Sequence, residues 1–372
     1  MAMSCPPQKP DVPDSKVSQI LRDYFGCSLI NVKRLDGYDD FSAHVTFTKQ
    51  DSSGKTVQQG VIKILGQTTL SNMNSRNLLV CGFLEHLCNA GLPFSRPFRL
   101  SDGTLNPPTI QLDHPEQEAC QGHYVHLLSY VEGVPLSMLD FHYDGYFLQK
   151  IGSLAARMHS VALTHPTHIP ERVKSPWYLV DVELLLDRIY AVNLSAEDVS
   201  LSLRAVKDFT SCLSRHKYTE SILHGDLKGD NIIMKVDKRS SPSLSGVIDF
   251  ADLVKGPVVI DIAVFAVAVW IVNWPPTQSL LQIISEVLAG YTETSDALPL
   301  TALDRELLYH AIPARCVQHL VMCRYDALHD PDNVSYLLSE DVYMLGALRE
   351  FYETCGKDSD LFISLHKHTT YS

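Results

Sequence analysis

The sequence predicts an α+β protein in two lobes, a small antiparallel-sheet lobe followed by a larger, mostly helical one. Short β-branched stretches fill the first third of the chain, helical patterns fill the remainder, and one turn-prone link separates them. The chain has 372 residues, of which 45% are hydrophobic, which is enough for a large core. We expect a disordered lead at 1–15, the small lobe at 16–130, a hinge at 131–136 and the helical lobe at 137–372.

The small lobe is expected to contain five strands and one helix. Valine, isoleucine and aromatic residues predict strands near 28–35, 43–48, 57–65, 109–112 and 124–130. Residues 51–55 have the composition of a hairpin turn. A 3.6-residue apolar period predicts a helix over 77–88, which Gly91 and Pro93 end.

The larger lobe is expected to be helical, with one β-rich island at 221–255. Apolar periodicity predicts helices near 148–158, 179–193, 198–214, 277–290, 304–326 and 336–355. The most apolar stretch, 258–274, is interrupted by Asp261 and closed by two prolines. It is therefore interpreted as a buried helix, because it is too short and too polar at its start to span a membrane.

Composition narrows the class of protein. The net charge of -12 argues against nucleic-acid binding, because such proteins gather Lys and Arg against the phosphate backbone. Nine cysteines without a Cys-x-x-Cys pair indicate reduced thiols, and Met1–Ser15 lacks the apolar core of a signal peptide. We expect a cytoplasmic protein with no nucleic-acid or membrane partner, whose oligomeric state the sequence leaves open.

The β-rich island carries the residues best suited to chemistry. Residues 224–231 read HGDLKGDN, and a Ser-rich turn and a strand at 247–248 then lead to Asp249. Phosphoryl transfer to a hydroxyl needs a carboxylate to take the proton and oxygen ligands for a metal on the phosphates. Asp226 and Asn231 have the spacing of a kinase catalytic loop, and Asn231 with Asp249 gives the oxygen-only set that suits Mg²⁺.

These motifs resemble those of the aminoglycoside phosphotransferase and choline kinase family, whose members have a protein-kinase-like two-lobed fold. The resemblance covers about residues 20–356 and rests on the loop at 224–231, the Ile-Asp-Phe at 248–250 and the hinge phrase at 127–136. Three looser phrases bring the chain closest to the hydroxylysine kinase branch of that family. They lie at 37–41, 151–156 and 318–322.

The resemblance assigns roles to the residues of the island. It implies that Asp226 accepts the hydroxyl proton and that Asn231 and Asp249 bind Mg²⁺. Lys228 occupies the position of a lysine near the γ-phosphate, although a solvated loop lysine is the safer interpretation. Asp261 would anchor the catalytic loop from the start of the buried helix, or it would be an ordinary acid of a helix's first turn.

The resemblance also assigns the nucleotide contacts. Lys63 would bind the α- and β-phosphates of ATP or GTP, Ser129 and Val131 would offer backbone groups to the purine, and residues 37–42 would cover the phosphates. The family pattern places a glutamate on the following helix as the partner of Lys63, but residues 78–82 contain no acid. Either the later Glu85 takes that role or Lys63 lacks the partner.

The acceptor is expected to be a small molecule. A glycine stands between His224 and Asp226 where protein kinases have arginine, and the interval before Asp261 leaves no room for a peptide-docking segment. Asp230 and Asp252 would hold an amine of the acceptor or would only hydrate the loop. The resemblance favours 5-hydroxy-L-lysine, with choline, ethanolamine or homoserine as alternatives and the choice of GTP or ATP open. A non-catalytic binding module is the alternative from another class.

Overall fold

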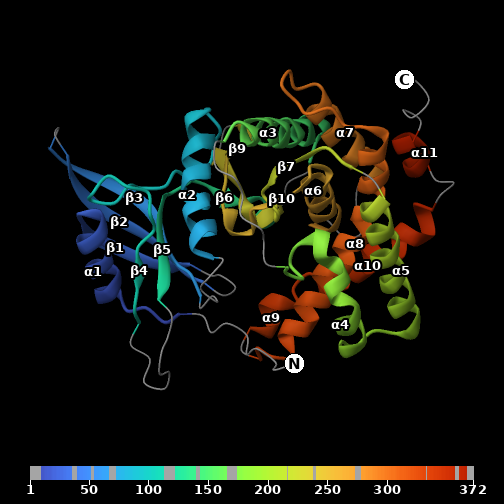
Figure 1. Ribbon diagram of the computed structural model, residues 1–372, viewed down its shortest axis with the longest axis horizontal. Helices are drawn as coiled ribbons and strands as arrows, with labels where there is room; N and C mark the ends of the chain where they lie inside the picture. Colours follow the sequence, from blue (N-terminus) through green and yellow to red (C-terminus); the bar gives the residue numbers. More distant parts are fainter. Residues whose placement is uncertain are drawn as a thin grey trace. The chain divides into compact units, whose positions relative to one another are not determined.

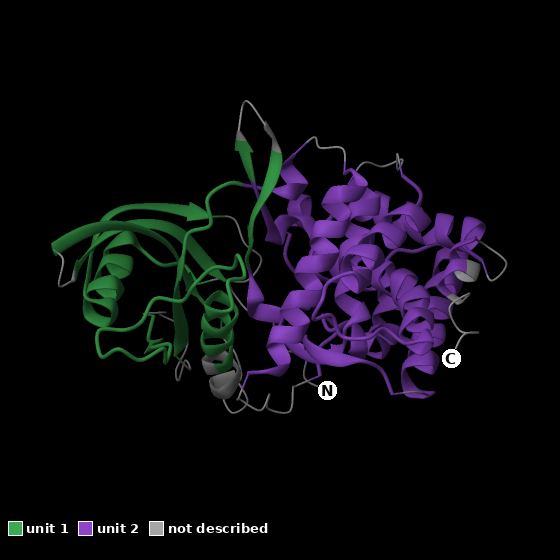
Figure 2. Cartoon of the chain, turned by 90° about the horizontal axis from the view of Figure 1, so that it is seen from above, with its two compact units in different colours: residues 1–133, 166–172, 235–248 green, residues 134–165, 173–234, 249–372 purple. Residues whose placement is uncertain are grey.

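The computed structural model describes residues 10–35, 40–51, 54–66, 73–112, 122–139, 143–165, 174–215, 217–237, 240–272, 278–331, 333–356 and 360–366. The chain divides into two compact units (Figure 2). Unit 1 contains the described residues of 1–133 and 235–248, and unit 2 those of 134–165, 173–234 and 249–372. The predicted α+β class, with the sheet first and the helices after it, is confirmed.

Unit 1 is built on a five-stranded antiparallel sheet in the order β1-β2-β3-β5-β4 (Figure 1). The strands are β1 (Cys27–Leu35), β2 (Phe41–Asp51), β3 (Gly54–Ile64), β4 (Thr109–Ile110) and β5 (His123–Ser129). Helix α1 (Asp14–Phe25) buries an apolar stripe that includes Val17, Ile20 and Leu21 in the same core as β2, β3 and β5. Helix α2 (Met73–Asn89) follows the third strand.

Unit 2 is mainly helical, and its centre is α6 (Val259–Val272), whose residues are nearly all buried. The other α-helices of unit 2 that the structure describes are α3 (Gly145–Leu163), α4 (Leu186–Ala191), α5 (Ala196–Arg215), α7 (Leu280–Thr292), α8 (Ala302–Ala327), α9 (Val334–Leu337), α10 (Asp341–Thr354) and α11 (Asp360–His366). Short 3₁₀ helices are η1 (Leu136–Met138), η2 (Leu179–Leu185), η3 (Gly229–Asn231) and η4 (Phe250–Asp252).

Two small sheets frame the β-rich island. One pairs β7 (Glu220–Leu223) with β10 (Val254–Pro257), and the other has the order β6-β8-β9. The strands of the second sheet are β6 (Val134–Pro135), β8 (Ile232–Asp237) and β9 (Ser240–Val247). Because β7 and β10 bracket the island, residues 224–253 begin and end side by side.

The structure departs from the sequence-based elements in several places. Helix α1 was not predicted, and it begins at Asp14 inside the expected disordered lead. The Ser-rich segment interpreted as a turn forms most of strand β9. The helix expected over 336–355 is divided into α9 and α10, and the one expected over 179–193 is the 3₁₀ helix η2 followed by α4. Helix α11 was not predicted either.

Other expectations concern the membrane and the thiols. Within the described residues, every helix is too short or too polar to cross a bilayer. The cysteines in the same part of the chain are free thiols. They are Cys27, Cys81, Cys88, Cys212, Cys316, Cys323 and Cys355.

Candidate active site

Residues 224–231, called the catalytic loop for the role that the sequence predicts, join β7 to β8 within unit 2. Its path depends on Gly225, which has a φ of +85° in the left-handed region. A Cβ atom at Gly225 would lie 2.3 Å from the carbonyl oxygen of Asp252, closer than real Cβ contacts allow. The position therefore requires glycine for both its conformation and its space. This gives a structural reason for the glycine that precedes Asp226.

Asp261, in the first turn of α6, holds the start of this loop. Its Oδ2 accepts the backbone N–H of His224 at 2.8 Å, and its Oδ1 accepts that of Gly225 at 2.9 Å. The Nε2 of His159 lies 3.0 Å from Oδ2, and both side chains are fully buried. Burial alone would raise the pKa of Asp261, but the hydrogen bonds from His159 and the loop lower it. The expected anchoring role of Asp261 is thus confirmed.

Asp226 lies among positively charged side chains. Arg315 Nη2 donates to its Oδ1 at 2.9 Å, and Lys228 Nζ lies 3.2 Å from its Oδ2. Burial would raise the pKa of Asp226, but Lys228 and Arg315 outweigh burial and hold that pKa well below its usual range. Asp226 is therefore an ionised carboxylate, able to accept a hydrogen bond from a hydroxyl.

Asn231 and Asp249 are the two residues expected to bind a metal. The Nδ2 of Asn231 donates to the backbone carbonyl of Asp226 at 2.8 Å and to its Oδ2 at 3.3 Å. That orientation leaves Oδ1 as the amide atom with the chemistry of a metal ligand. Asp249 has a φ of 64°, and it is the one non-glycine position with positive φ among the described residues. Such backbone strain is concentrated at functional sites in proteins, which makes Asp249 a candidate on its own geometry.

In unit 1, Lys63 projects from β3 opposite His126 of β5. Its Nζ lies 3.9 Å from Oδ2 of Asp40. Glu85, the open candidate for its partner, instead accepts a hydrogen bond from Arg99 Nη2 at 2.5 Å. Residues 37–39 of the expected phosphate loop lie outside the described residues. Asp40, a described residue of that loop, therefore lies within ion-pair distance of Lys63.

The two residues expected at the purine edge come at the end of unit 1. Ser129 is the last residue of β5, and its backbone N–H donates to the carbonyl of Arg96 at 2.7 Å. Its hydroxyl oxygen accepts the N–H of Arg96 at 2.8 Å. Because the N–H of Ser129 is already bonded to Arg96, its expected contact with the purine would have to come from its backbone carbonyl. Val131 follows two residues later, before the boundary between units at Gly133.

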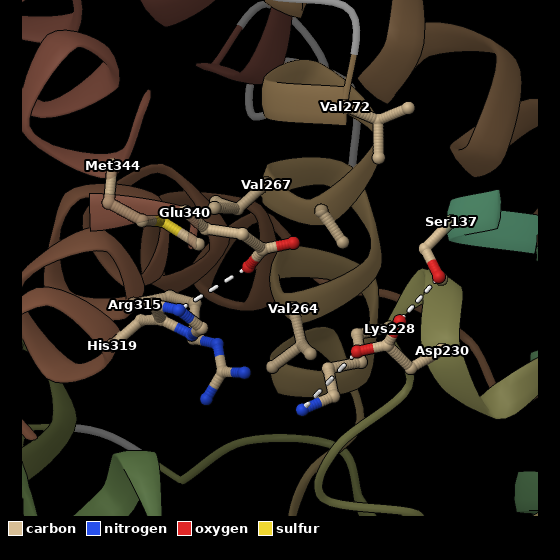
Figure 3. A pocket seen from close by; sticks show the side chains of 12 residues that line it. Ser137, Lys228, Asp230, Val264, Val267, Val272, Arg315, His319, Glu340 and Met344 are labelled. Atoms are coloured by element: carbon tan, nitrogen blue, oxygen red, sulfur yellow. Dashed lines mark hydrogen bonds and ion pairs between the residues drawn. The ribbon is translucent and has the colours of Figure 1, made fainter. Parts of the chain in front are cut away.

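A pocket opens beside the catalytic loop within unit 2 (Figure 3). Its volume of about 330 Å³ includes space that is open to solvent. One wall is apolar and comes from α6, while the loop, α8 and the start of α10 supply charged groups. The lining residues are Ser137, Lys228, Gly229, Asp230, Val264, Val267, Ala268, Val272, Arg315, His319, Glu340 and Met344. The pocket thus combines a surface for methylene groups with groups that recognise charge.

Two carboxylates line this pocket in different settings. Asp230 accepts a hydrogen bond from Ser137 Oγ, and Lys228 Nζ lies 3.9 Å from it. Glu340 Oε2 lies 3.3 Å from His319 Nε2 (Figure 3). Burial raises the pKa of Glu340, and burial, reinforced by Arg315, lowers the pKa of His319 to about 3. The imidazole is therefore neutral. Asp252, the other acid expected near an amine, is not among the lining residues.

Sequence reasoning missed Arg315, His319 and Glu340 as site residues. A signal for Arg315 was present, because it is the sole charged side chain between Ala311 and Cys323, and an arginine in such a run must be buried with a partner. It is 5% exposed, and its partner is Asp226. Glu340 had no comparable signal, since it stands among polar residues before α10 and reaches the pocket only through the fold.

Comparisons with known proteins identify the family of the chain. Residues 81–295 match the phosphotransferase enzyme family. Hydroxylysine kinase of Danio rerio is 26% identical over 366 residues, which cover 96% of each chain. Hydroxylysine kinase of Mus musculus is 27% identical over 342 residues, which cover 89% of this chain and 86% of that protein. These matches favour an enzyme over the binding-module alternative.

Solved structures show the same fold. An amicoumacin kinase bound to AMP-PNP, Ca²⁺ and amicoumacin has a TM-score of 0.61 at 15% identity, covering 92% of this chain and 93% of that one. Plasmodium vivax ethanolamine kinase has a TM-score of 0.54 at 15% identity, covering 90% and 88%. The kinase-like, two-lobed class implied by the resemblance is therefore confirmed. The chain belongs to the phosphotransferase enzyme family, as a small-molecule kinase with a hydroxyl group as acceptor.

Proposed function

We propose that this enzyme transfers the γ-phosphoryl group of GTP or ATP to the hydroxyl of 5-hydroxy-L-lysine, with GTP at least as effective as ATP. The observation that carries the proposal is the pocket beside Asp226, in which two carboxylates face an apolar wall. Asp230 and Glu340 suit the two amines of hydroxylysine, and the α6 wall suits its methylene groups. The two hydroxylysine kinases that align over most of this chain support the same acceptor.

In the proposed reaction the acceptor hydroxyl donates its hydrogen bond to Asp226. The hydroxyl oxygen forms a bond to the γ-phosphorus while the bond from that phosphorus to the bridging oxygen breaks, and the electron pair leaves with the nucleoside diphosphate. The hydroxyl proton passes to the carboxylate of Asp226. Because the transition state of phosphoryl transfer is loose, positioning and charge count for more than the basicity of Asp226.

The donor's contacts complete the proposal. Lys63 binds the α- and β-phosphates, Lys228 lies near the γ-phosphate, and the backbone of Ser129 and Val131 reads the purine. An aminoglycoside 2'-phosphotransferase of the same fold is known as a GDP complex, which supports keeping GTP beside ATP.

Asn231 and Asp249 would hold Mg²⁺, whose preference for oxygen ligands and phosphates fits this donor set. When bound, the cation neutralises charge on the β- and γ-phosphates. Activity that persists after chelation of all divalent cations would contradict this metal site.

An acceptor panel tests the proposed function. The purified full chain with Mg²⁺ should phosphorylate 5-hydroxy-L-lysine in preference to choline, ethanolamine and homoserine, with GTP and ATP compared for each acceptor. Nucleoside diphosphate release gives the rate, and phosphorus NMR identifies the ester. L-Lysine, which lacks the hydroxyl, should inhibit competitively.

The variant Asp226→Asn tests whether Asp226 accepts the proton of the acceptor hydroxyl. This change keeps the shape of the side chain but removes the proton acceptor, so kcat should fall on the order of 10²-fold or more while nucleotide affinity changes little. Phosphorylation of choline or homoserine with hydroxylysine left untouched would overturn the acceptor but not the family.

A further inference from the structure

Arg315 is unusual among the cations of unit 2 because it is both buried and part of the pocket wall. Its side chain is 5% exposed, against 27% for Lys228, the other lining cation. Nη2 donates to Asp226 Oδ1 at 2.9 Å, and Nη1 donates to Gln318 Oε1 at 2.8 Å. A guanidinium has five N–H donors, and described residues take two of them by these bonds.

The position of Gln318 shows that the guanidinium is held firmly. Gln318 is fully buried, and its Nε2 donates to the carbonyl of Pro176 at 3.0 Å. Its amide is thus fixed from both ends, with the oxygen directed at Arg315. A guanidinium fixed along one side by a buried amide and a carboxylate presents a defined remaining edge, which suits a planar carboxylate.

An acid lies close to this cation on the same side of the pocket. Arg315 and His319 are one helical turn apart on α8, and Glu340 contacts His319 at 3.3 Å (Figure 3). Because the imidazole of His319 is neutral, it does not cancel the charge of Glu340. An α-amino acid carries an ammonium and a carboxylate on one carbon atom, so a site for it needs an anion and a cation side by side. Glu340 and Arg315 provide that pair.

We propose that Arg315 binds the carboxylate of an amino-acid acceptor, with Glu340 taking its α-amine. The inference rests on the proposed function and deepens it, because it identifies the group by which the site distinguishes an amino acid from a simple amino alcohol. The same guanidinium contacts the catalytic Asp226. Arg315 therefore sets the spacing between the carboxylate of the acceptor and the hydroxyl that is phosphorylated.

The spacing argument makes the hydroxyl position part of the selection. In 5-hydroxylysine four bonds of the carbon chain separate the carboxyl carbon from the carbon that bears the hydroxyl. With the carboxylate on one edge of the guanidinium and Asp226 on another, the hydroxyl reaches Asp226 only from a chain of suitable length. The apolar wall of Val264, Val267 and Val272 supports the methylene groups between the two ends.

The test compares two acceptors that differ only in the carboxylate. They are 5-hydroxy-L-lysine and its decarboxylated counterpart, 1,5-diaminopentan-2-ol. The wild type should favour hydroxylysine in kcat/KM by about 10- to 100-fold, as for charge-assisted hydrogen bonds. In Arg315→Gln this preference should fall to about 1, because the charge is lost.

Arg324→Gln is the matched control. Arg324 lies on the same helix and pairs with Asp341 at 2.6 Å, but it does not line the pocket. This variant should keep the wild-type preference for the carboxylate. If Arg315→Gln lowers kcat/KM equally for both acceptors, Arg315 acts on Asp226 or the phosphoryl group alone and the inference is wrong.

Two further measurements keep the inference testable if Arg315→Gln does not fold. A wild-type enzyme that treats the two acceptors alike contradicts it without any variant. Calorimetry on Arg315→Lys should show weaker binding of hydroxylysine and nearly unchanged binding of the diamine.

Failure of the proposed function is a separate outcome. If the wild type accepts homoserine in place of hydroxylysine, the same comparison with 3-aminopropan-1-ol applies. Loss of the preference in Arg315→Gln would then support the inference while the hydroxylysine proposal fails. If the wild type turns over hydroxylysine well but Arg315→Gln keeps the preference for the carboxylate, the proposed function stands and the inference about Arg315 is wrong.

Discussion

Asp226 and Asp261 are both ionised carboxylates of unit 2, but their partners differ in kind. Asp261 accepts backbone N–H groups of the catalytic loop and pairs with His159, all without exposure to solvent. Asp226 contacts charged side chains, those of Arg315 and Lys228, and is 18% exposed. The carboxylate of Asp261 fixes the path of the loop, and in the proposed function that of Asp226 accepts a hydrogen bond from the substrate.

Asp261→Asn tests the fixing role. The carboxamide oxygen can replace one acceptor, but its NH₂ group would face a backbone N–H or His159, leaving buried donors unsatisfied. The free energy of unfolding should fall by about 2–4 kcal/mol, and kcat should fall by about tenfold or more as the loop loosens. Urea unfolding and steady-state kinetics measure the two effects. Asp187→Asn on the exposed face of α4 is the control, and a loss under about 0.5 kcal/mol in Asp261→Asn would contradict the role.

At the scale of elements, α3 and α7 approach each other through glycine. A Cβ atom at Gly152 of α3 would lie 2.0 Å from the carbonyl oxygen of Val287, and one at Gly290 of α7 would lie 1.9 Å from that of Gln149. The two helix backbones are therefore in contact. The same helices carry His159 and Tyr291, whose ring nitrogen and hydroxyl lie 3.1 Å apart next to Asp261.

Gly152→Ala should separate these helices. The added methyl group would meet backbone atoms, which cannot move aside as a flexible side chain can. The free energy of unfolding should therefore fall by about 1–3 kcal/mol. Because His159 moves with α3, kcat should also decline. Gly356→Ala is the matched control, since a Cβ at that position meets nothing within 4 Å. Thermal unfolding of both variants gives the comparison, and equal melting temperatures would show that the crossing tolerates the extra atom.

The sequence predicted the sheet of unit 1 and the catalytic loop because these depend on local signals. Alternating strands show their own period, and Asp226 and Asn231 keep a fixed spacing within one loop. Helix α1 also had a signal, with Val17, Ile20 and Leu21 on one face and Gly26 in a left-handed end. Strand β9 had none, because its serines favour turns by composition and only pairing with β8 makes them a strand.

The proposed acceptor side of the site depends on tertiary packing, so the sequence indicates that Arg315 is buried with a partner but not which partner it has. Arg315 meets Asp226 across 89 residues of sequence, and Glu340 reaches the pocket from the start of α10. Pairings of this kind follow from how α6, α8 and α10 pack in unit 2. The roles of Lys63, Ser129 and Val131 remain predictions, because they concern a nucleotide and not a contact within the chain.

At the scale of the whole molecule, the candidate metal ligands flank a segment that belongs to unit 1. The chain leaves unit 2 after Met234 and returns to it at Asp249. Within unit 1 this segment is tied down by the N–H of Val247, which donates to the carbonyl of Pro93 at 3.0 Å. Asn231 and Asp249 therefore stand just outside its two ends. Binding of a metal by Asn231 and Asp249 should therefore restrain the backbone of strand β9.

Hydrogen exchange measures that link. With Mg²⁺ and nucleotide bound, the amide of Val247 should exchange more slowly, because fixing Asp249 restrains the chain two residues away. Asp249→Ala should remove most of this protection at saturating nucleotide. The amide of Ser101, bonded to the carbonyl of Tyr24 at 2.8 Å, is the reference within unit 1. Protection of Val247 that is equal in the wild type and in Asp249→Ala would show that the two regions are independent.

The division of unit 1 between distant segments also affects how the protein is made. Its sheet is complete in the chain by residue 133, but strand β9 follows only at 240–247, roughly 100 residues later. At ribosomal speeds of about 5–20 residues per second, the interval is on the order of 5–20 s. During that time the carbonyls of Pro93 and Glu132 lack the partners that Val247 and Ser245 later provide. Unit 1 therefore lacks these two hydrogen bonds until the segment with strand β9 has been synthesised. Asp249 follows directly after that segment.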